Sequence, residues 1–381
     1  MNNSLSRRIP VKNVEIQGSV WAGLKCTSMM DTLNKAVMAD QSVQYFYKED
    51  LNIPIGIRGM VDDTLGISKC GSESIKLNSV INSFIQSQRL TLSESKSCVV
   101  HIGKKHKTNL PCPKLKIRNS EMKISDSAKY LGNFVTSRGG VRDTVEDRRN
   151  KGWGKVATIK GLLSEVDLGD NRVEVGLLLK KAILVNSLLF TAETWSGIKE
   201  SDLVRMEQVD LALISSLVSG HSKCPQEFAY LETGSLKLRH ILTQNRLMYH
   251  HHLITQEDSE KTRKMYEKQK VSPTKGDWYS LLLKDFEFIE EQIDDEKIKS
   301  MTKDESKKKI KILVAKAALK YFNNQKQGHT KVKDIVYQDL KIQSYLTSSF
   351  FTKEERNLLY SMRSNCNPAK NNCVNSGKTQ G

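Results

Sequence analysis

The sequence predicts an α+β fold in which a mixed segment, residues 1–140, precedes a mostly helical remainder. Two patterns predict it: short apolar and polar alternations recur before Val141, and runs with helical spacing dominate after it. The hydrophobic content of 38% over 381 residues is enough to bury a core in more than one domain. The formal net charge of +17 favours a polyanion such as nucleic acid as a partner, although many basic proteins bind none.

The first segment reads as helix, hairpin, helix, strand and hairpin. The run MMDTLNKAVMADQSVQYF has helical spacing, and LNIPIGIRGMVDDTLGISK reads as two short strands around a polar turn. Helical spacing returns in SESIKLNSVINSFIQSQRL. The strand candidates SKSCVVHIG, EMKIS and AKYLGNFVT follow, before SRGG breaks the pattern.

The remainder divides by composition. Long amphipathic patterns predict a helical domain over 141–255, and the charged stretch 256–275, punctuated by Pro273, predicts a linker. Residues 276–365 suggest further helices. Residues 366–381 have no core-forming power and are expected to be a disordered tail.

The predicted compartment is intracellular, either cytoplasm or nucleus, without a membrane contact. No stretch reaches about 18 consecutive apolar residues, and the start MNNSLSRRIPVKN lacks the apolar segment of a secretory signal. The cysteines are odd in number and scattered, which favours reduced thiols over disulfides. They are Cys26, Cys70, Cys98, Cys112, Cys224, Cys366 and Cys373.

Asp62 and Asp63 interrupt the apolar hairpin IPIGIRGMVDDTLGISKC, where two like charges are costly unless a cation binds them. Two carboxylates at a hairpin tip can form half a site for a hard divalent ion, with substrate phosphates as further ligands. Adjacent aspartates also occur by chance. Asp294 and Asp295, in EEQIDDEKIKS, are such a pair and are expected to lie in a solvated helix. The residues alone leave both interpretations open.

The stretch GMVDDTLGIS resembles the catalytic hairpin of reverse transcriptases, with Met60 where an aromatic residue usually stands. Upstream, Gln17 and Gly18 in QGSVWAGLKCTSMMD resemble the Gln-Gly turn that supports template and nucleotide. Downstream, Lys96 in LTLSESKSCVVHIG matches a strand-entry lysine of that family. The stretch KISDSAKYLGNFVT resembles the hairpin that grips the primer end, with Tyr130, Leu131 and Gly132 in the matching positions.

These four motifs occur in the family's order, at spacings of roughly 45, 35 and 35 residues, and cover approximately residues 14–140. The pattern is most similar to reverse transcriptases of non-LTR, LINE-like retrotransposons. The resemblance implies a partial polymerase palm, an RRM-like antiparallel sheet with helices, followed by a thumb-like helical region. It implies Mg²⁺ or Mn²⁺ held by Asp62 and Asp63. The implied partners are an RNA template, a DNA primer, their RNA–DNA duplex and deoxynucleotides.

Two departures from the family limit the expected activity. The family's third catalytic carboxylate lies upstream of the Gln-Gly turn, and here no acidic residue precedes Glu15. Neither Cys366 nor Cys373 has the cysteine and histidine neighbours of a zinc module. The chain is therefore expected to be truncated at both ends and to be weak or inactive as a polymerase. The alternative is a non-enzymatic nucleic-acid-binding remnant of a retrotransposon polyprotein.

Other candidates carry two interpretations each. By the resemblance, Lys96 is a general acid toward pyrophosphate; by its residue type alone, it is a solvated lysine. Two lysine groups contact phosphates or are only solvated: Lys104, Lys105, Lys107, Lys114 and Lys116 in a loop, and Lys307, Lys308 and Lys309 on a helix. Consecutive residues His250 to His252 point about 100° apart on a helix, so a helix surface is expected rather than a metal site. Trp153, Trp195 and Trp278 are expected in the core.

Overall fold

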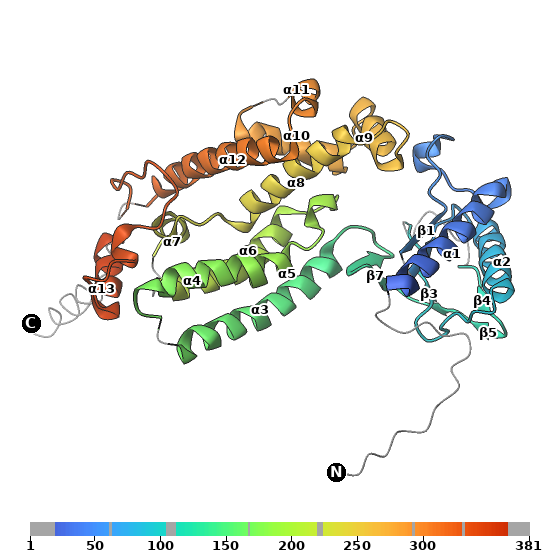
Figure 1. The fold of residues 1–381 in the computed structure, drawn as a ribbon, viewed down its shortest axis with the longest axis horizontal. Helices are drawn as coiled ribbons and strands as arrows, with labels where there is room; N and C mark the ends of the chain where they lie inside the picture. Colours follow the sequence, from blue (N-terminus) through green and yellow to red (C-terminus); the bar gives the residue numbers. More distant parts are fainter. Residues whose placement is uncertain are drawn as a thin grey trace, which may run out of the picture. The chain divides into compact units, whose positions relative to one another are not determined.

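The structure, a computed structural model, is mixed α+β and divides into two compact units, Met1–Gly139 and Gly140–Gly381 (Figure 1). The residues that it describes are 20–60, 63–103, 112–166, 168–218, 224–291, 294–329 and 332–364. The expected tail, 366–381, lies outside them. Within the described residues, no helix is both long and apolar enough to cross a membrane. The five cysteines in these ranges form no disulfide.

The first unit has helix, hairpin and helix in the predicted order: α1 (Val20–Ala39), β1 (Ile57–Met60) with β2 (Asp63–Gly66), and α2 (Gly71–Ser87). Two 3-10 turns, η1 (Gln41–Val43) and η2 (Tyr47–Glu49), join α1 to β1. The strands that follow in the described residues are β3 (Cys98–Val99), β4 (Lys116–Ile117), β5 (Ser120–Glu121), β6 (Lys123–Ile124), β7 (Ser127–Tyr130) and β8 (Asn133–Thr136).

The strands of this unit do not build the one antiparallel sheet that the sequence analysis expects. In the described part of the chain they pair two by two: β1–β2, β4–β5 and β7–β8 are antiparallel, and β3–β6 is parallel. Strands of two to four residues offer few ladder hydrogen bonds, so each pair depends on neighbouring elements for stability. For β1–β2 these elements are α1 and α2. Their core comprises Met30, Leu33, Val37, Val43, Ile57 and Leu77.

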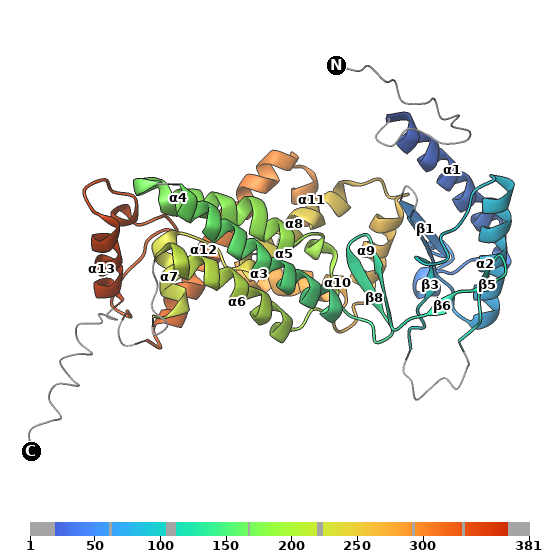
Figure 2. The same ribbon diagram turned by 90° about the horizontal axis from the view of Figure 1, so that it is seen from below.

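The second unit is helical, as predicted. Its first half comprises α3 (Arg142–Glu165), η3 (Gly169–Asn171), α4 (Arg172–Leu179), the π-helical turn η4 (Lys180–Val185), α5 (Asn186–Leu188), η5 (Ala192–Thr194), α6 (Glu200–Leu217) and α7 (Gln226–Thr233). Its second half comprises α8 (Leu238–Thr255), α9 (Lys261–Val271), α10 (Trp278–Ile289), α11 (Asp295–Lys299), α12 (Lys303–Lys326), η6 (Ser344–Leu346) and α13 (Lys353–Arg363). Helix α3 packs beside α6, and α8 beside α12 (Figure 2).

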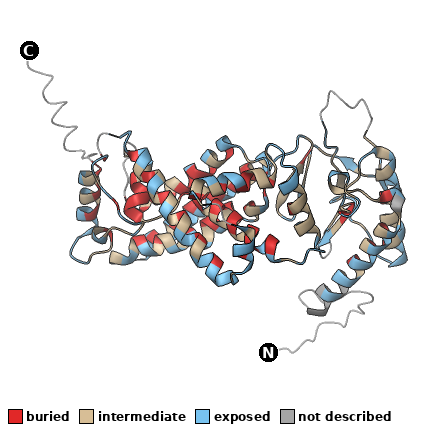
Figure 3. Cartoon of the chain, turned by 90° about the horizontal axis from the view of Figure 1, so that it is seen from above, coloured by how far each residue is buried: buried red, intermediate tan, exposed pale blue. Residues whose placement is uncertain are grey.

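Burial in this unit is concentrated where the helices face one another (Figure 3). Trp195 and Trp278 are buried, as expected, whereas Trp153 is 40% exposed on α3, so its assignment to the core is wrong. The side chains that α3 buries recur at helical spacing and form one face of the helix, and Trp153 lies beside this face rather than on it. They include Val145, Val156, Ile159 and Leu163.

The segment 256–275, expected to be a linker, contains α9 and is packed against its neighbours. Tyr266 is 3% exposed and shares a core cluster with Trp278. Its hydroxyl donates to Asp295 at 2.9 Å, and Lys270 pairs with the same carboxylate at 2.7 Å. His250 is 3.1 Å from the other oxygen of that carboxylate. Asp295 is therefore part of a half-buried cluster, not the solvated residue that its charged sequence neighbours suggest.

The segment from Val332 to Ser364 is attached to α7 through Glu232, whose side chain is fully buried. Tyr337 and Tyr345 donate their hydroxyls to this carboxylate, the second at 2.5 Å, and Arg363 donates to it at 2.9 Å. A buried carboxylate is costly unless it is paired and hydrogen-bonded. These three donors make its burial tolerable and connect α13 to α7.

Lys180, the first residue of the π-helical turn, is a buried cation with a complete set of partners. Its ammonium lies 3.0 Å from Asp210 and donates to Ser235 Oγ at 2.8 Å and to Leu236 O at 3.1 Å. Burial lowers the pKa of Lys180, and the charge of Asp210 opposes this shift. The pair links η4, α6 and the chain after α7.

We expect Lys180→Met to lower the free energy of unfolding by about 3–5 kcal/mol, because it leaves Asp210 buried without its cation. Urea denaturation measures the loss. The control is Lys151→Met, which breaks the 2.6 Å pair with Asp147 on the surface of α3 and should cost less than about 1 kcal/mol. Equal losses for the two variants would contradict the assigned role of the buried pair.

A second prediction concerns His240, a 1% exposed imidazole stacked on Phe288 with ring centroids 5.1 Å apart. Burial, with help from nearby cations, lowers its pKa to about 3. At pH values between about 3 and about 6.5, the imidazole of His240 is protonated in the unfolded chain but not in the folded chain. Stability contributed by neutral His240 is therefore lost as the pH falls through this window, by about 2 kcal/mol at pH 5.

His240→Phe keeps a planar ring against Phe288 and removes this titration. Its free energy of unfolding should fall about 2 kcal/mol less than that of the wild type between pH 7 and pH 5. The exposed His252, changed to Phe, is the control and should leave the pH dependence unaltered. Parallel pH curves for the wild type and His240→Phe would refute the expectation.

Candidate functional site

The hairpin β1–β2 consists of two short strands around a turn, as its sequence pattern predicts. Ile57 pairs with Gly66, and Met60 pairs with Asp63, so two residues, 61 and 62, connect the strands. Asp63 is the first residue of β2 and is exposed. Asp62 lies outside the described residues, as do Gln17 and Gly18.

One face of this hairpin is buried against the helices of the first unit. Ile57 is 2% exposed and belongs to the core cluster formed with α1 and α2. A Cβ on Gly59 would lie 2.9 Å from Met30 Cε, and a Cβ on Gly66 would lie 3.1 Å from Leu77 Cδ2. Both glycines therefore point toward the helices, and their small size lets the helices approach.

The opposite face presents charge. Because side chains alternate along a strand and paired residues share a face, Arg58, Met60, Asp63 and Leu65 all lie on the side away from α1 and α2. Met60, at the position of the family's aromatic residue, is 58% exposed. At the tip of the hairpin, the carboxylate of Asp63 and the apolar side chain of Met60 are therefore both exposed to solvent.

The hairpin β7–β8 contributes Tyr130 to this neighbourhood. Burial raises the pKa of the Tyr130 phenol, the charge of Asp63 raises it further, and Arg58 opposes the rise. Tyr130 is therefore close enough to both residues for their charges to act on it. The two predicted hairpins lie near one another, and at neutral pH the phenol is protonated and can donate a hydrogen bond.

The turn of β7–β8 requires left-handed backbone at both of its central residues. Tyr130 pairs with Asn133, and Leu131 and Gly132 between them have φ of 47° and 80°. These values fit a type I′ turn, which suits the twist of a two-residue hairpin. Glycine adopts such a conformation readily, but leucine does not. Leu131 is 39% exposed, so burial does not compensate its strain.

Arg58 is the residue of this site that the sequence analysis missed. Its guanidinium is fixed by two backbone carbonyls, donating from Nη1 to Ile57 O at 2.9 Å and from Nη2 to Pro54 O at 3.0 Å. The signal was available: once Ile57 is placed in the core, strand alternation puts Arg58 on the face of Asp63.

Lys96 is not part of this group. It lies in a turn directly before β3 and is exposed. In the described chain, β3 pairs with β6 and not with the β1–β2 hairpin. Lys96 is also not among the charges that act on Tyr130 or Arg58.

The described residues supply one carboxylate, that of Asp63, toward a divalent ion. No group of three His, Cys, Asp or Glu side chains suited to a metal occurs in the described ranges. Magnesium usually takes one or two protein carboxylates and completes its shell with water and substrate phosphates. An exposed Asp63 fits such a substrate-assisted site and does not fit an all-protein metal cage.

The three consecutive histidines do not share a surface. His250 and His251 are buried, and only His252 is exposed, so the expectation of a helix surface is right for one of the three. His251 lies 3.3 Å from the carbonyl of Met301, a contact between α8 and the chain before α12. The buried pair therefore connects helices.

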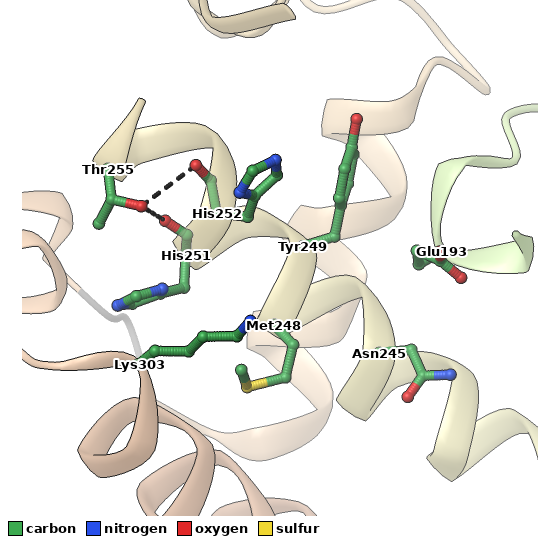
Figure 4. A pocket seen from close by; sticks show the side chains of 8 residues that line it. All are labelled: Glu193, Asn245, Met248, Tyr249, His251, His252, Thr255 and Lys303. Carbon is green, nitrogen blue, oxygen red and sulfur yellow. Dashed lines mark hydrogen bonds between the residues drawn. The ribbon is translucent and has the colours of Figure 1, made fainter. Parts of the chain in front are cut away.

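The exposed side of α8 lines a depression of about 420 Å³ (Figure 4). Asn245, Tyr249 and His252 come from successive turns of α8, with Glu193 and Lys303 at its borders. The depression is open and combines one carboxylate with one ammonium group.

The lysines of the two basic segments, 104–116 and 307–309, differ in whether they form ion pairs. Lys104, Lys105 and Lys107 lie outside the described residues. Lys114 pairs with Glu121 at 3.4 Å, and Lys309 with Glu291 at 2.6 Å. Lys116, Lys307 and Lys308 are exposed.

No family model matches the chain, and no curated protein matches its sequence. The resemblance to reverse transcriptases therefore depends on the order of the motifs.

We expect Leu131→Asn to stabilise the protein by about 1 kcal/mol, because asparagine tolerates the left-handed region that leucine resists. Chemical denaturation checks the gain. Leu131→Ala is the matched control: it removes the side chain but keeps the backbone strain, so it should bring no gain. A loss of stability in Leu131→Asn would show that the leucine side chain has a stabilising contact.

Proposed function

We propose that the chain is a reverse-transcriptase-like protein that binds RNA–DNA duplexes at the first hairpin, with RNA-templated DNA synthesis as the function of its lineage. One observation carries the proposal: Asp63 lies exposed at the tip of a two-stranded hairpin, within electrostatic range of Tyr130 from a second hairpin. The motifs predict these two hairpins to be the catalytic and primer-binding hairpins of a palm.

Within this proposal, Asp62 and Asp63 would hold Mg²⁺ or Mn²⁺, which when bound stabilises the charges of a phosphoryl transfer. The chain's own residues position the nucleic acid. Tyr130 keeps its proton because of burial and Asp63, so its hydroxyl can donate to a phosphate or sugar oxygen. Leu131 and Gly132 form the exposed turn beside it.

The other assignments extend the same proposal. Gln17 and Gly18 would support the template and the incoming deoxynucleotide. A general-acid role for Lys96 is supported by the resemblance alone, because Lys96 is not among the charges that act on Tyr130 or Arg58. The helical second unit would serve as a thumb. The net charge of +17 supports a polyanionic partner. A retrotransposon protein of this kind works inside the cell, in cytoplasm or nucleus.

A second candidate is duplex binding without catalysis. It is favoured by the scarcity of acidic ligands in the described ranges, which contain no group of three His, Cys, Asp or Glu side chains suited to a metal. A two-metal reaction that lacks one carboxylate should be slower by orders of magnitude. For the 381-residue polypeptide we therefore expect strong binding and weak extension.

Primer extension and duplex binding, measured on the same purified chain, test the proposal. We expect an affinity for an RNA–DNA duplex that falls as salt rises, because phosphate contacts release counterions. We expect slow, Mg²⁺-dependent extension that Asp62→Asn and Asp63→Asn abolish while binding persists. Asp31→Asn, an exposed carboxylate of the same unit, is the matched control and should change neither measurement.

The outcomes separate the two candidates. Binding with no extension in any variant supports the non-enzymatic candidate, and rapid extension contradicts the expected weakness. Absence of duplex binding at low salt would refute both candidates. Extension that survives both aspartate substitutions would show that the hairpin is not the catalytic site.

A further inference from the structure

Arg58 is a fixed, half-buried cation whose hydrogen bonds within the chain go to backbone carbonyls. The carbonyls of Ile57 and Pro54 each accept one N–H, at 2.9 and 3.0 Å. Burial lowers the pKa of this guanidinium, and Tyr130 is the one side chain of the described residues that acts on it. Arg58 therefore has lost part of its hydration without gaining a carboxylate partner among the described residues.

The guanidinium retains binding capacity. It has five N–H donors, of which two are occupied by the carbonyls. The side chain of Arg58 is half-buried, and its Nε, which donates to none of the described residues, is not one of their buried, unbonded polar atoms, so the guanidinium is accessible to solvent. A planar guanidinium that is already held in place loses little entropy when it binds an oxyanion through two parallel hydrogen bonds.

The surroundings select the kind of anion. Arg58 and Asp63 share a face of the hairpin, yet no ion pair joins them in the described structure. Tyr130, which interacts electrostatically with both, adds a neutral hydroxyl donor. A carboxylate ligand could use Arg58 alone, whereas a phosphate group has enough oxygens for the arginine, the phenol and a cation beside Asp63.

We propose that Arg58 binds a phosphate group of the nucleic-acid substrate on the exposed face of the β1–β2 hairpin, with the Tyr130 hydroxyl as a neighbouring donor. This inference rests on the proposed function and makes Arg58 a positioning residue of that site. The phosphate belongs to a phosphodiester of the bound duplex or to an incoming deoxynucleotide. The chemistry is shared by the two sources, and the experiment separates them.

The test compares Arg58→Met, Arg58→Lys and the control Arg118→Met in binding a labelled RNA–DNA duplex and, separately, a deoxynucleoside triphosphate. Arg118 is an exposed arginine of the same unit, bonded to Thr91. Salt titrations in EDTA and in Mg²⁺ provide a readout that does not depend on catalysis. Thermal melts establish that each variant is folded before binding is measured.

We expect Arg58→Met to weaken duplex binding about tenfold and to reduce the salt dependence by about one phosphate contact. Arg58→Lys should recover part of the affinity, because it keeps the charge and loses the planar fork. Asp63→Asn should strengthen binding in EDTA, because it removes a negative charge beside the phosphate. Arg118→Met should change affinity less than about threefold.

Loss of duplex affinity assigns the phosphate to the bound strand, and loss confined to the triphosphate assigns it to the nucleotide. A folded Arg58→Met that binds both ligands like the wild type overturns this inference and leaves the proposed function standing. A wild type that binds neither ligand overturns both. If Arg58→Met is unfolded, Arg58→Lys decides: an affinity and salt slope equal to the wild type refute the role of the planar guanidinium.

Discussion

The burial of Ile57 between α1 and α2 determines the chemistry of the first unit. A strand alternates its side chains with a period of two, so fixing one residue in the core fixes the direction of every other residue of the hairpin. With Ile57, Gly59 and Gly66 turned toward the helices, Arg58 and Asp63 must face away. A slip of one residue would bury Arg58 and expose Ile57, a costly exchange that keeps the register unique.

Close packing explains the two glycines of this hairpin better than flexibility does. A side chain at Gly59 would have to displace the flexible end of Met30, and one at Gly66 would press on Leu77. The helices can therefore approach the hairpin closely and hold a strand pair that would be marginal alone. Helices α1 and α2 pack against the face of the hairpin opposite Asp63, so Asp63 lies on a strand pair that is held in place.

The second unit differs from the hairpin in how its charged side chains are paired. Three of its buried carboxylates are paired with a cation: Asp210 with Lys180, Asp285 with Arg246 at 2.6 Å, and Glu232 with Arg363. Such pairs contribute little net stability but penalise any arrangement that separates them. Arg58 and Asp63 on the first hairpin have no such pairing in the described residues. This contrast is what makes the hairpin, and not the helical unit, the candidate for binding an external charged ligand.

Sequence patterns were sufficient for elements with a strong local period. The β1–β2 hairpin, the helices around it and the helical second unit follow from alternation and helical spacing. The stretch AKYLGNFVT was expected to be a single strand, and this was wrong: it is divided into β7 and β8 by the turn at Leu131 and Gly132. Local patterns were insufficient where burial is decided by distant residues. Asp295 looks solvated among charged neighbours, yet His250 and Tyr266 from other helices enclose it. The same holds for the segment 256–275 and for the strand pairs, which did not join into one sheet.

The sequence by itself determined that two aspartates stand at a hairpin and that the chain is basic, because both are properties of residue order and composition. Only the tertiary structure decided that Arg58 and Tyr130 accompany Asp63. Tyr130 lies far from the hairpin in sequence, and its approach depends on how the hairpins pack. Arg58 is near in sequence, but its face is defined only once Ile57 has a core to enter. The physical reason in both cases is that charge interacts through space, whereas a motif records only position along the chain.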